Sequence, residues 1–254
     1  MGNTLLVKSE SELAIMTEGG KRLGRVKAEL KKAVKIGGTA AGLEGLANKL
    51  IAKEGGTPSF KGVPGYHWAT CVNVNAGVVH GIPNAEIIFK KGDVVSVDVG
   101  MKYRGFHTDT SFSVGLSSDR KTARFLEVGE RALKKAIEMA KPGNRVYDIS
   151  ETIERQVRGA GLTPVEDLVG HGIGKDLHEE PQIPCFSRGK REESPLISQG
   201  AVLAIEVMYV KGKKDLVLGH DGWTISTADG KIAALFEETV AVTSGGPLIL
   251  TEDN

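Results

Sequence analysis

Apolar residues in the first half of the chain have the spacing of two helices followed by strands. Over residues 9–35 they recur near every third or fourth position, which predicts a helix, although the pair Gly19-Gly20 weakens its middle. The lysines of this segment fit a solvated helix face. A second helix is predicted over residues 40–54, and residues 68–114 are predicted to be mostly strand.

The second half of the chain repeats this plan. Helices are predicted over residues 119–140 and 146–159, and strand-rich sequence follows. The repeat is longer than the roughly 20–50 residues of solenoid units, so it indicates one α+β domain over residues 1–254 made of two half-domains, residues 1–117 and 118–254. If the halves pack about a pseudo-twofold axis, antiparallel strands from both halves meet at the centre and helices flank them.

Acidic residues occur at matching places in the strand-rich parts of both halves. In the first half, a His-Gly-Ile string is followed by Asp98 and Asp109, each within an apolar run, and in the second half the same string is followed by Glu206 and Glu237. Burying an unpaired carboxylate is costly, so four carboxylates in matching apolar runs need a common partner. A bound cation is the simplest such partner.

The segment from residue 92 to residue 115 has the pattern of a β-hairpin. A two-residue turn at Arg104-Gly105 would place Asp109 opposite Gly100 and diagonal to Asp98, all on one face of the sheet. The two carboxylates would then lie about 7–8 Å apart, and Gly100 would leave space between them for cations. An arginine in the left-handed region is unusual, so a longer turn is the alternative.

The candidate constellation consists of four carboxylates and one imidazole, those of Asp98, Asp109, His171, Glu206 and Glu237. Four negative charges match two divalent cations, and oxygen-rich ligands suit manganese, iron, cobalt or zinc. Two such ions about 3.5–4 Å apart can activate a water molecule and polarise a carbonyl. A single acidic residue in a strand is usually an edge or loop residue, but the repeated register favours a hydrolytic metal centre.

Composition and charge exclude several other classes of protein. The chain has 33 basic and 32 acidic residues, which gives no electrostatic reason to expect nucleic acid or an anionic membrane as a partner. It contains only two cysteines, and neither forms a C-x-x-C pair. We find no secretory signal and no apolar run long enough to span a bilayer, so we expect a reduced, cytoplasmic protein.

Six strings of the sequence occur in a distinctive order, together with the spacing from Asp98 to Asp109. The strings are Val79-His80-Gly81-Ile82-Pro83, Gly105-Phe106-His107-Thr108-Asp109-Thr110, Gly170-His171-Gly172-Ile173-Gly174, His178-Glu179-Glu180-Pro181, Ile205-Glu206 and Phe236-Glu237. With these strings the chain resembles the type I methionine aminopeptidases of the pita-bread metallopeptidase family over nearly its whole length. The resemblance implies the pita-bread fold and a metal-dependent exopeptidase that removes the initiator methionine from nascent proteins.

The resemblance also implies a role for each member of the constellation. Asp98 corresponds to a ligand of one metal ion, and His171 and Glu206 correspond to ligands of the other. Asp109 and Glu237 correspond to ligands that bridge both ions. The identity of the two divalent ions, among cobalt, manganese, iron and zinc, is left open.

Further residues correspond to positions that contact the substrate in this family. His80 and His178 match two histidines beside the scissile peptide, and Glu206 matches the general base and acid. A pocket for the methionine side chain would be lined by Tyr66, Cys71, Leu177 and Trp223. Leu177 departs from the family, because the better-known bacterial enzymes tend to carry an aromatic residue there, so we expect a less sharply defined pocket.

Two alternatives share parts of this interpretation. An Xaa-Pro aminopeptidase or prolidase uses the same ligand set, but those proteins generally carry an extra N-terminal domain, and only 97 residues precede Asp98 here. A non-catalytic pita-bread binding protein would commonly lack metal ligands, and all five are present. The expected partners are the N-termini of nascent polypeptides, with a ribosome contact left open, no membrane, no specific nucleic acid, and a monomeric state.

Overall fold

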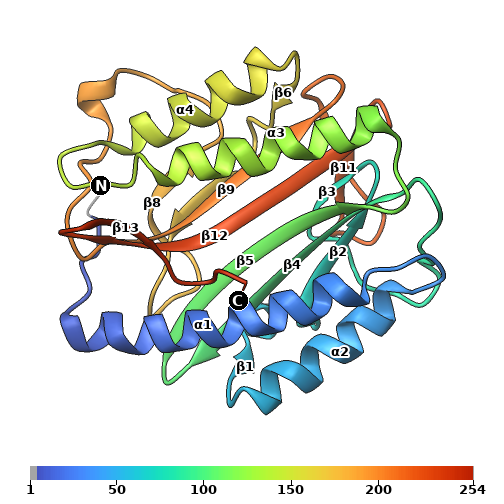
Figure 1. The fold of residues 1–254 in the computed structure, drawn as a ribbon, viewed down its shortest axis with the longest axis horizontal. Coiled ribbons are helices and arrows are strands. Elements are labelled where there is room, and N and C mark those ends of the chain that lie inside the picture. Colours follow the sequence, from blue (N-terminus) through green and yellow to red (C-terminus); the bar gives the residue numbers. More distant parts are fainter. Residues whose placement is uncertain (1–4, 254) are drawn as a thin grey trace.

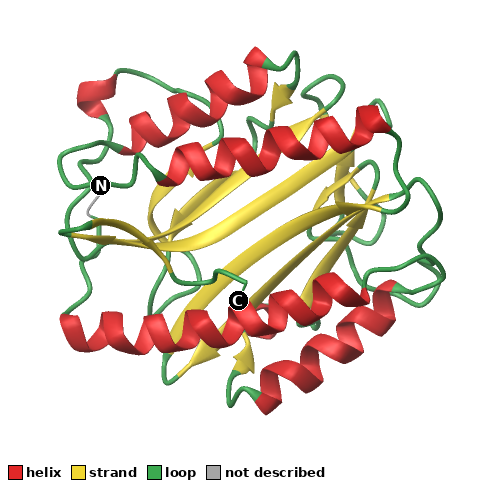
Figure 2. Ribbon diagram, in the orientation of Figure 1, coloured by secondary structure: helices red, strands yellow, loops and turns green. Residues whose placement is uncertain are grey.

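The computed structural model describes residues 5–253, in which four α-helices cover one face of a ten-stranded antiparallel sheet (Figures 1 and 2). The helices are α1 (Glu10–Ala33), α2 (Ala40–Lys53), α3 (Arg120–Ile137) and α4 (Val146–Gly159). All four predicted helices are confirmed, with ends shifted by at most three residues. The first three helices each begin at a capping residue whose side chain accepts a hydrogen bond from the backbone N–H three residues further along the chain. The capping residues are Ser9, Thr39 and Asp119.

The strands are β1 (Thr57–Pro58), β2 (Thr70–Val74), β3 (Gly77–Val79), β4 (Val94–Tyr103), β5 (Phe106–Gly115), β6 (Thr163–Pro164), β7 (Val169–Gly172), β8 (Glu179–Pro184), β9 (Val202–Val210), β10 (Leu216–Leu218), β11 (Ile225–Thr227), β12 (Ala233–Thr243) and β13 (Gly246–Ile249). The main sheet has the order β1-β4-β5-β12-β9-β7-β8, with β2 on β4, β6 on β9 and β13 on β12. Strands β10, β11 and β3 form a small second sheet.

The two halves of the chain meet where β5 pairs with β12 at the centre of the main sheet. On one side β5 pairs with β4, and on the other β12 pairs with β9, so each half contributes a long antiparallel pair. The expected meeting of strands from both halves is therefore confirmed. The half-domain boundary between residues 117 and 118 stays a prediction.

Apolar side chains on the helix side of the sheet form two cores. One core packs α1 and α2 against β4 and β5, and the other packs α3 and α4 against β9 and β12. A third apolar cluster, which includes Tyr66, Cys71 and Leu177, belongs to the segments around the candidate site. The face of the sheet that the helices leave free is therefore available for a functional site. Among residues 5–253, no helix is long and apolar enough to cross a membrane.

The glycines of α1 have a packing role that the sequence pattern did not reveal. A Cβ atom added to Gly20 would lie 2.5 Å from the carbonyl oxygen of Leu250, and one added to Gly24 would lie 2.2 Å from that of Glu252. The glycines therefore let the C-terminal segment lie directly against the helix. The expectation of a uniformly solvated lysine face is wrong for Lys27, whose side chain is buried and paired with Glu238.

Candidate metal centre

Neighbouring strands place the candidate residues in two adjacent rows on the free face of the sheet. In the first row Asp98 on β4 pairs with Ser111 on β5, Ser111 with Glu237 on β12, and Glu237 with Glu206 on β9. In the next row His171 on β7 pairs with Ala204 on β9, while Asp109 lies two residues from Ser111 on β5. Since alternate residues share a face, all five candidate side chains are directed to the same side.

The predicted hairpin has the predicted register. Arg104 and Gly105 have φ values of 48° and 90°, and Asp109 pairs with Gly100, so the two-residue turn is confirmed and the longer one is wrong. The expected space at Gly100 is also wrong. A Cβ atom there would lie 2.9 Å from atoms of both Ser59 and Phe60, so these residues fill the position that was expected to hold cations.

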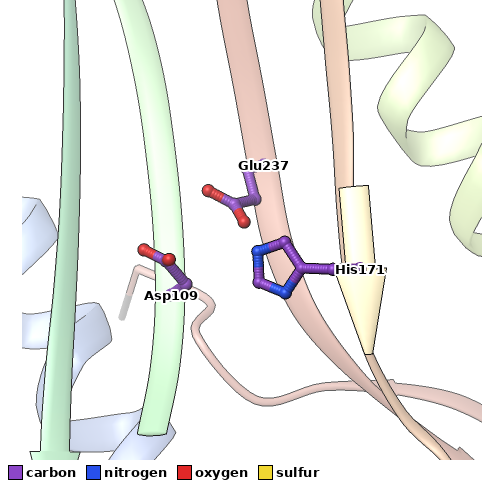
Figure 3. Close-up of side chains that lie close together, drawn as sticks. All are labelled: Asp109, His171 and Glu237. Atoms are coloured by element: carbon purple, nitrogen blue, oxygen red, sulfur yellow. The ribbon is translucent and has the colours of Figure 1, made fainter. Parts of the chain in front are cut away.

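Side chains from three strands converge at the centre of the site (Figure 3). Ligand atoms of Asp109, His171 and Glu237 all lie within 4.8 Å of one another. The Nε2 atom of His171 lies 3.6 Å from Oε1 of Glu206. The Nδ1–H of His171 donates to the carbonyl oxygen of Gly172 at 2.9 Å, which leaves Nε2 as the nitrogen with a free lone pair.

The carboxylates of the site lack a compensating charge. Asp109 is 4% exposed and Glu237 is 2% exposed, yet within residues 5–253 no lysine or arginine forms an ion pair with any of the four carboxylates. The Oδ1 atom of Asp98 and the Oε1 atom of Glu237 are buried without any hydrogen-bond partner. Buried, unpartnered carboxylate oxygens are costly. This donor set therefore fits divalent cations, which would supply the missing positive charge.

Burial shifts the proton affinities of the site strongly. It raises the pKa of Asp109 to about 7, and burial followed by the charge of Asp109 raises the pKa of both Asp98 and Glu206 well above the ordinary range. The pKa of Glu237 is raised for the same two reasons, and the charge of Glu206 raises it further. Burial lowers the pKa of His171 to about 4, so its ring is neutral and able to bind a cation.

Two further histidines border this group. The ring of His178 stands edge-on to that of His171, with centroids 4.6 Å apart and planes at 87°. His80 follows β3 with φ 58°, a strained backbone conformation for a residue other than glycine, and its ring lies 6.4 Å from that of Trp223. Burial lowers the pKa of both His80 and His178, which favours neutral rings that can donate or accept hydrogen bonds.

A cavity of about 500 Å³ connects all of the predicted site residues. Its lining includes the four carboxylates, the three histidines and, from the predicted methionine pocket, Tyr66, Cys71, Leu177 and Trp223. The structure therefore brings together every residue that the sequence predicts for the site. The hydroxyl of Tyr66 donates to the carbonyl oxygen of Thr70 at 2.9 Å and lies 3.2 Å from Sγ of Cys71, which fixes the pocket wall.

Several supporting residues were not found from the sequence. Glu44 on α2 accepts hydrogen bonds from the backbone N–H groups of Ala69 and Thr70, which holds the strand that carries Cys71. Lys8 forms a buried ion pair with Glu179, directly beside His178. Phe60, Val63 and Met208 complete the cavity wall. Apart from Glu179, which belongs to the string His178-Glu179-Glu180-Pro181, none of these residues belongs to a repeat or a motif, so no signal in one sequence could have identified them.

Comparison with known proteins agrees with this geometry. Residues 14–244 match the model of metallopeptidase family M24. The chain is 42% identical to methionine aminopeptidase 1 of Bacillus subtilis over 250 residues, covering 97% of this chain and 99% of that protein. The crystal structure of methionine aminopeptidase from Thermotoga maritima superposes with a TM-score of 0.94 at 39% identity, covering 98% of this chain and 100% of the other.

The same fold occurs in a more distant group of structures. Prolidase from Pyrococcus furiosus has a TM-score of 0.78 at 20% identity, with 98% of this chain matching 66% of that longer chain. The pita-bread fold predicted from the sequence is therefore confirmed. The chain belongs to metallopeptidase family M24 and is a metal-dependent hydrolase of peptides.

Proposed function

We propose that this protein is a methionine aminopeptidase, which hydrolyses the first peptide bond of polypeptides that begin with methionine. The observation that carries the proposal is the single cavity in which uncompensated carboxylates adjoin an apolar pocket. An apolar, unbranched methionine side chain fits a pocket lined by aromatic and sulfur-containing residues. The named relatives in Bacillus subtilis and Thermotoga maritima support this substrate class.

The residues of the metal centre would share two divalent ions. Asp98 would bind one ion, His171 and Glu206 would bind the other, and Asp109 and Glu237 would bridge both. The convergence of Asp109, His171 and Glu237 within 4.8 Å supports this arrangement. Oxygen and imidazole donors suit cobalt, manganese, iron and zinc, and the availability of these ions in the cell would determine which of them is bound.

The side chains around the ions would perform the proton transfers. When bound, the ion pair would activate a water molecule and polarise the carbonyl of the first residue. Glu206 would accept the proton of the attacking water and deliver it to the departing amine as the C–N bond breaks. His178 would donate a hydrogen bond to the oxyanion that forms on the carbonyl, and His80 would bind the amide on the leaving side.

The two alternatives have less support. Xaa-Pro peptidases share the fold, but the prolidase match is at 20% identity, about half the 42% identity to methionine aminopeptidase 1 of Bacillus subtilis. A non-catalytic binding protein would have no need of four adjacent carboxylates without counterions, two of which, those of Asp109 and Glu237, are buried. The N-termini of nascent proteins as substrates, action in the cytoplasm and a monomeric state stay predictions.

A metal-reconstitution assay separates these functions. The protein is freed of metal, supplied separately with each of the four candidate ions, and assayed on Met-Ala-Ser, Met-Pro-Ser and Ala-Pro peptides. We expect release of methionine from Met-Ala-Ser, loss of this activity with a chelator, and far slower cleavage of the proline peptides. Cleavage of Ala-Pro alone would instead identify an Xaa-Pro peptidase, and no cleavage with any ion would identify a binding protein.

A further inference from the structure

His178 lies on a segment that has no regular secondary structure. Residues 173–178, which we call the His178 segment, connect β7 to β8 and belong to neither strand. His178 itself is exposed, and within residues 5–253 its ring has no hydrogen-bond partner and packs edge-on against that of His171. The position of this ring therefore depends on what holds the His178 segment.

A buried ion pair holds the residue that follows His178. The Nζ atom of Lys8 donates to Oε2 of Glu179, and the two side chains are only 5% and 4% exposed. The other carboxylate oxygen of Glu179, Oε1, accepts a hydrogen bond from the backbone N–H of Asp176 at 3.4 Å. Asp176 precedes His178 by two residues, so one carboxylate connects both sides of His178 to Lys8.

The backbone of Lys8 is itself fixed to the main sheet. Its N–H donates to the carbonyl oxygen of Gly200 at 2.8 Å, just before β9 begins. The N–H of Gly200 in turn donates to the carbonyl oxygen of Val242 on β12, also at 2.8 Å. Lys8 therefore extends from a point that is bound to the two strands carrying the glutamates of the metal centre.

Gly174 gives the ion pair its place beside the His178 segment. A Cβ atom added to Gly174 would lie 2.6 Å from Oε1 of Glu179 and even closer to Cε of Lys8. The carbonyl oxygen of Gly174 accepts a hydrogen bond from the backbone N–H of His107 on β5 at 2.7 Å. The segment is thus packed directly on the ion pair at one point and bound to β5, the strand of Asp109, at the same residue.

The burial of this pair distinguishes it from a second ion pair on the same segment. Lys175 pairs with Glu12 at 3.1 Å, but its side chain is 72% exposed, and exposed pairs hold their partners only weakly. Breaking the buried pair would leave the charge of Glu179 without a partner, which is costly. Glu179 would then move toward water, and the adjacent His178 would move with it.

We propose that Lys8, acting through Glu179, is a positioning residue that holds the imidazole of His178 where it can donate to the oxyanion. This inference rests on the proposed function. Lys8 does not line the active-site cavity, so it should influence the rate only through the His178 segment. Misplacing a catalytic group by about 1 Å can lower the rate by about 10²-fold, so the effect should be measurable.

The test combines Lys8→Met with His178→Ala in the metal-loaded protein and measures release of methionine from Met-Ala-Ser. In the original protein, Lys8→Met should lower kcat by about ten- to a hundredfold, with KM changed by less than about threefold and the metal content per folded molecule near normal. In the His178→Ala background, the same change should lower kcat by less than about twofold, because the group that Lys8 positions is already absent.

Matched variants test the ion pair on its own. Glu179→Gln should lower kcat about as much as Lys8→Met, and the two changes together should cost no more than either alone, because the pair acts as a unit. Lys175→Met is the control, since it breaks the exposed pair on the same segment and should leave kcat near that of the original protein.

A glycine variant gives the same test without removing a charge, should Lys8→Met fail to fold. Gly174→Ala forces the ion pair and the His178 segment apart, so it should lower kcat in the original protein and not in the His178→Ala background. Gly159→Ala is its control, because a Cβ atom there has no other atom within 4 Å.

Hydrogen exchange of the backbone amides of residues 174–178 tests the positioning without using activity. Exchange should be faster in Lys8→Met than in the original protein and unchanged in Lys175→Met. An equal loss of kcat in both backgrounds, or unchanged kcat or unchanged exchange in Lys8→Met, would overturn the inference. Failure of the original protein to release methionine from Met-Ala-Ser would instead overturn the proposed function, and hydrogen exchange would still decide whether Lys8 holds the segment.

Discussion

Two consecutive glutamates on β12 lie on opposite faces of the sheet and differ in their surroundings. Glu238, on the helix side, accepts hydrogen bonds from Nζ of Lys27 and from the hydroxyl of Thr251. Glu237, on the free face, has an Oε1 atom that is buried and has no partner at all. Burial raises the pKa of both side chains, so burial alone does not distinguish them.

The difference lies in which part of the molecule supplies the positive charge. Lys27 is 2% exposed, and its Nζ atom also lies 3.3 Å from Oδ1 of Asp253. The helix-side cluster, which consists of Lys27, Glu238 and Asp253, therefore contains its own counterion. The metal-centre cluster is the constellation of four carboxylates and His171 described above, and within residues 5–253 it contains no lysine or arginine as a counterion. A buried carboxylate with an internal partner is therefore structural, whereas a group of carboxylates without one indicates a site for an external cation.

The largest expected effect comes from removing a bridging carboxylate. Asp109→Asn should lower both the metal content and the activity, because one side chain would serve two ions. The loss of kcat/KM should exceed the about 10²–10³-fold that one oxyanion donor contributes. Metal content is measured on the purified protein by elemental analysis, beside turnover of Met-Ala-Ser.

Glu238→Gln is the matched control for this change. Asp109 lies on β5 and Glu238 on the neighbouring strand β12, so the control removes one carboxylate from the same strand pair but on the helix side of the sheet. It should lower stability but leave the metal content per folded molecule near normal. Full occupancy and unchanged turnover in Asp109→Asn would contradict the role given to Asp109.

Removing His178 should separate catalysis from metal binding. His178→Ala should lower kcat by about 10²–10³-fold, the scale for one oxyanion donor, while the metal content stays near normal. The exposed His220 is the control, and His220→Ala should change neither quantity. Loss of metal from the His178 variant would show that this residue is a ligand.

Breaking the helix-side pair should affect stability rather than chemistry. Lys27→Met leaves the charge of Glu238 buried without its partner and should lower the free energy of unfolding of the metal-free protein by about 3 kcal/mol. Lys31→Met is the control, since Lys31 is 40% exposed and its pair should contribute less than about 1 kcal/mol. Urea unfolding measures both, and a metal content altered in Lys27→Met but not in Lys31→Met would contradict the separation of the two clusters.

The sequence predicted the local geometry of strands and helices well, but it did not predict the contacts between segments that are distant in the chain. The register of the β4–β5 hairpin follows from strand periodicity and a two-residue turn, so the position of Asp109 could be derived before the structure. The helix ends also follow from local signals, such as the Ser9 and Glu12 capping box. The convergence of both halves followed from the repeat.

Contacts between distant segments could not be derived in this way. Lys27 lies at helical spacing from Leu23 and Leu30, on the apolar face of α1, but its partners Glu238 and Asp253 come from β12 and the C-terminal segment, which the spacing does not specify. Lys8 meets Glu179 across 171 positions of sequence, and although Glu179 belongs to a motif, nothing in that motif identifies Lys8 as its partner. The space expected at Gly100 is filled by Ser59 and Phe60, which lie in a segment whose path the sequence does not specify.

The smallest expected effect concerns the methionine pocket beside the metal centre. Leu177 is 9% exposed, lines the cavity, and packs in the same apolar cluster as Tyr66 and Cys71. An aliphatic side chain is smaller and more flexible than an aromatic ring, so the pocket should exclude branched side chains only weakly. One methylene of misfit in an apolar pocket changes discrimination by about 1–3 kcal/mol, so the preference for methionine over leucine should be modest.

Leu177→Phe should raise this preference, because an aromatic ring that adopts an unstrained rotamer would narrow the pocket wall beside His178. We expect the ratio of kcat/KM for Met-Ala-Ser over Leu-Ala-Ser to rise severalfold, with metal content unchanged. Leu177→Met is the control, since it nearly conserves side-chain volume and should leave the ratio close to that of the original protein. If the ratio is the same in all three proteins, Leu177 contacts the cavity without shaping substrate choice, and the other pocket residues Tyr66, Cys71 and Trp223 would account for the preference for methionine.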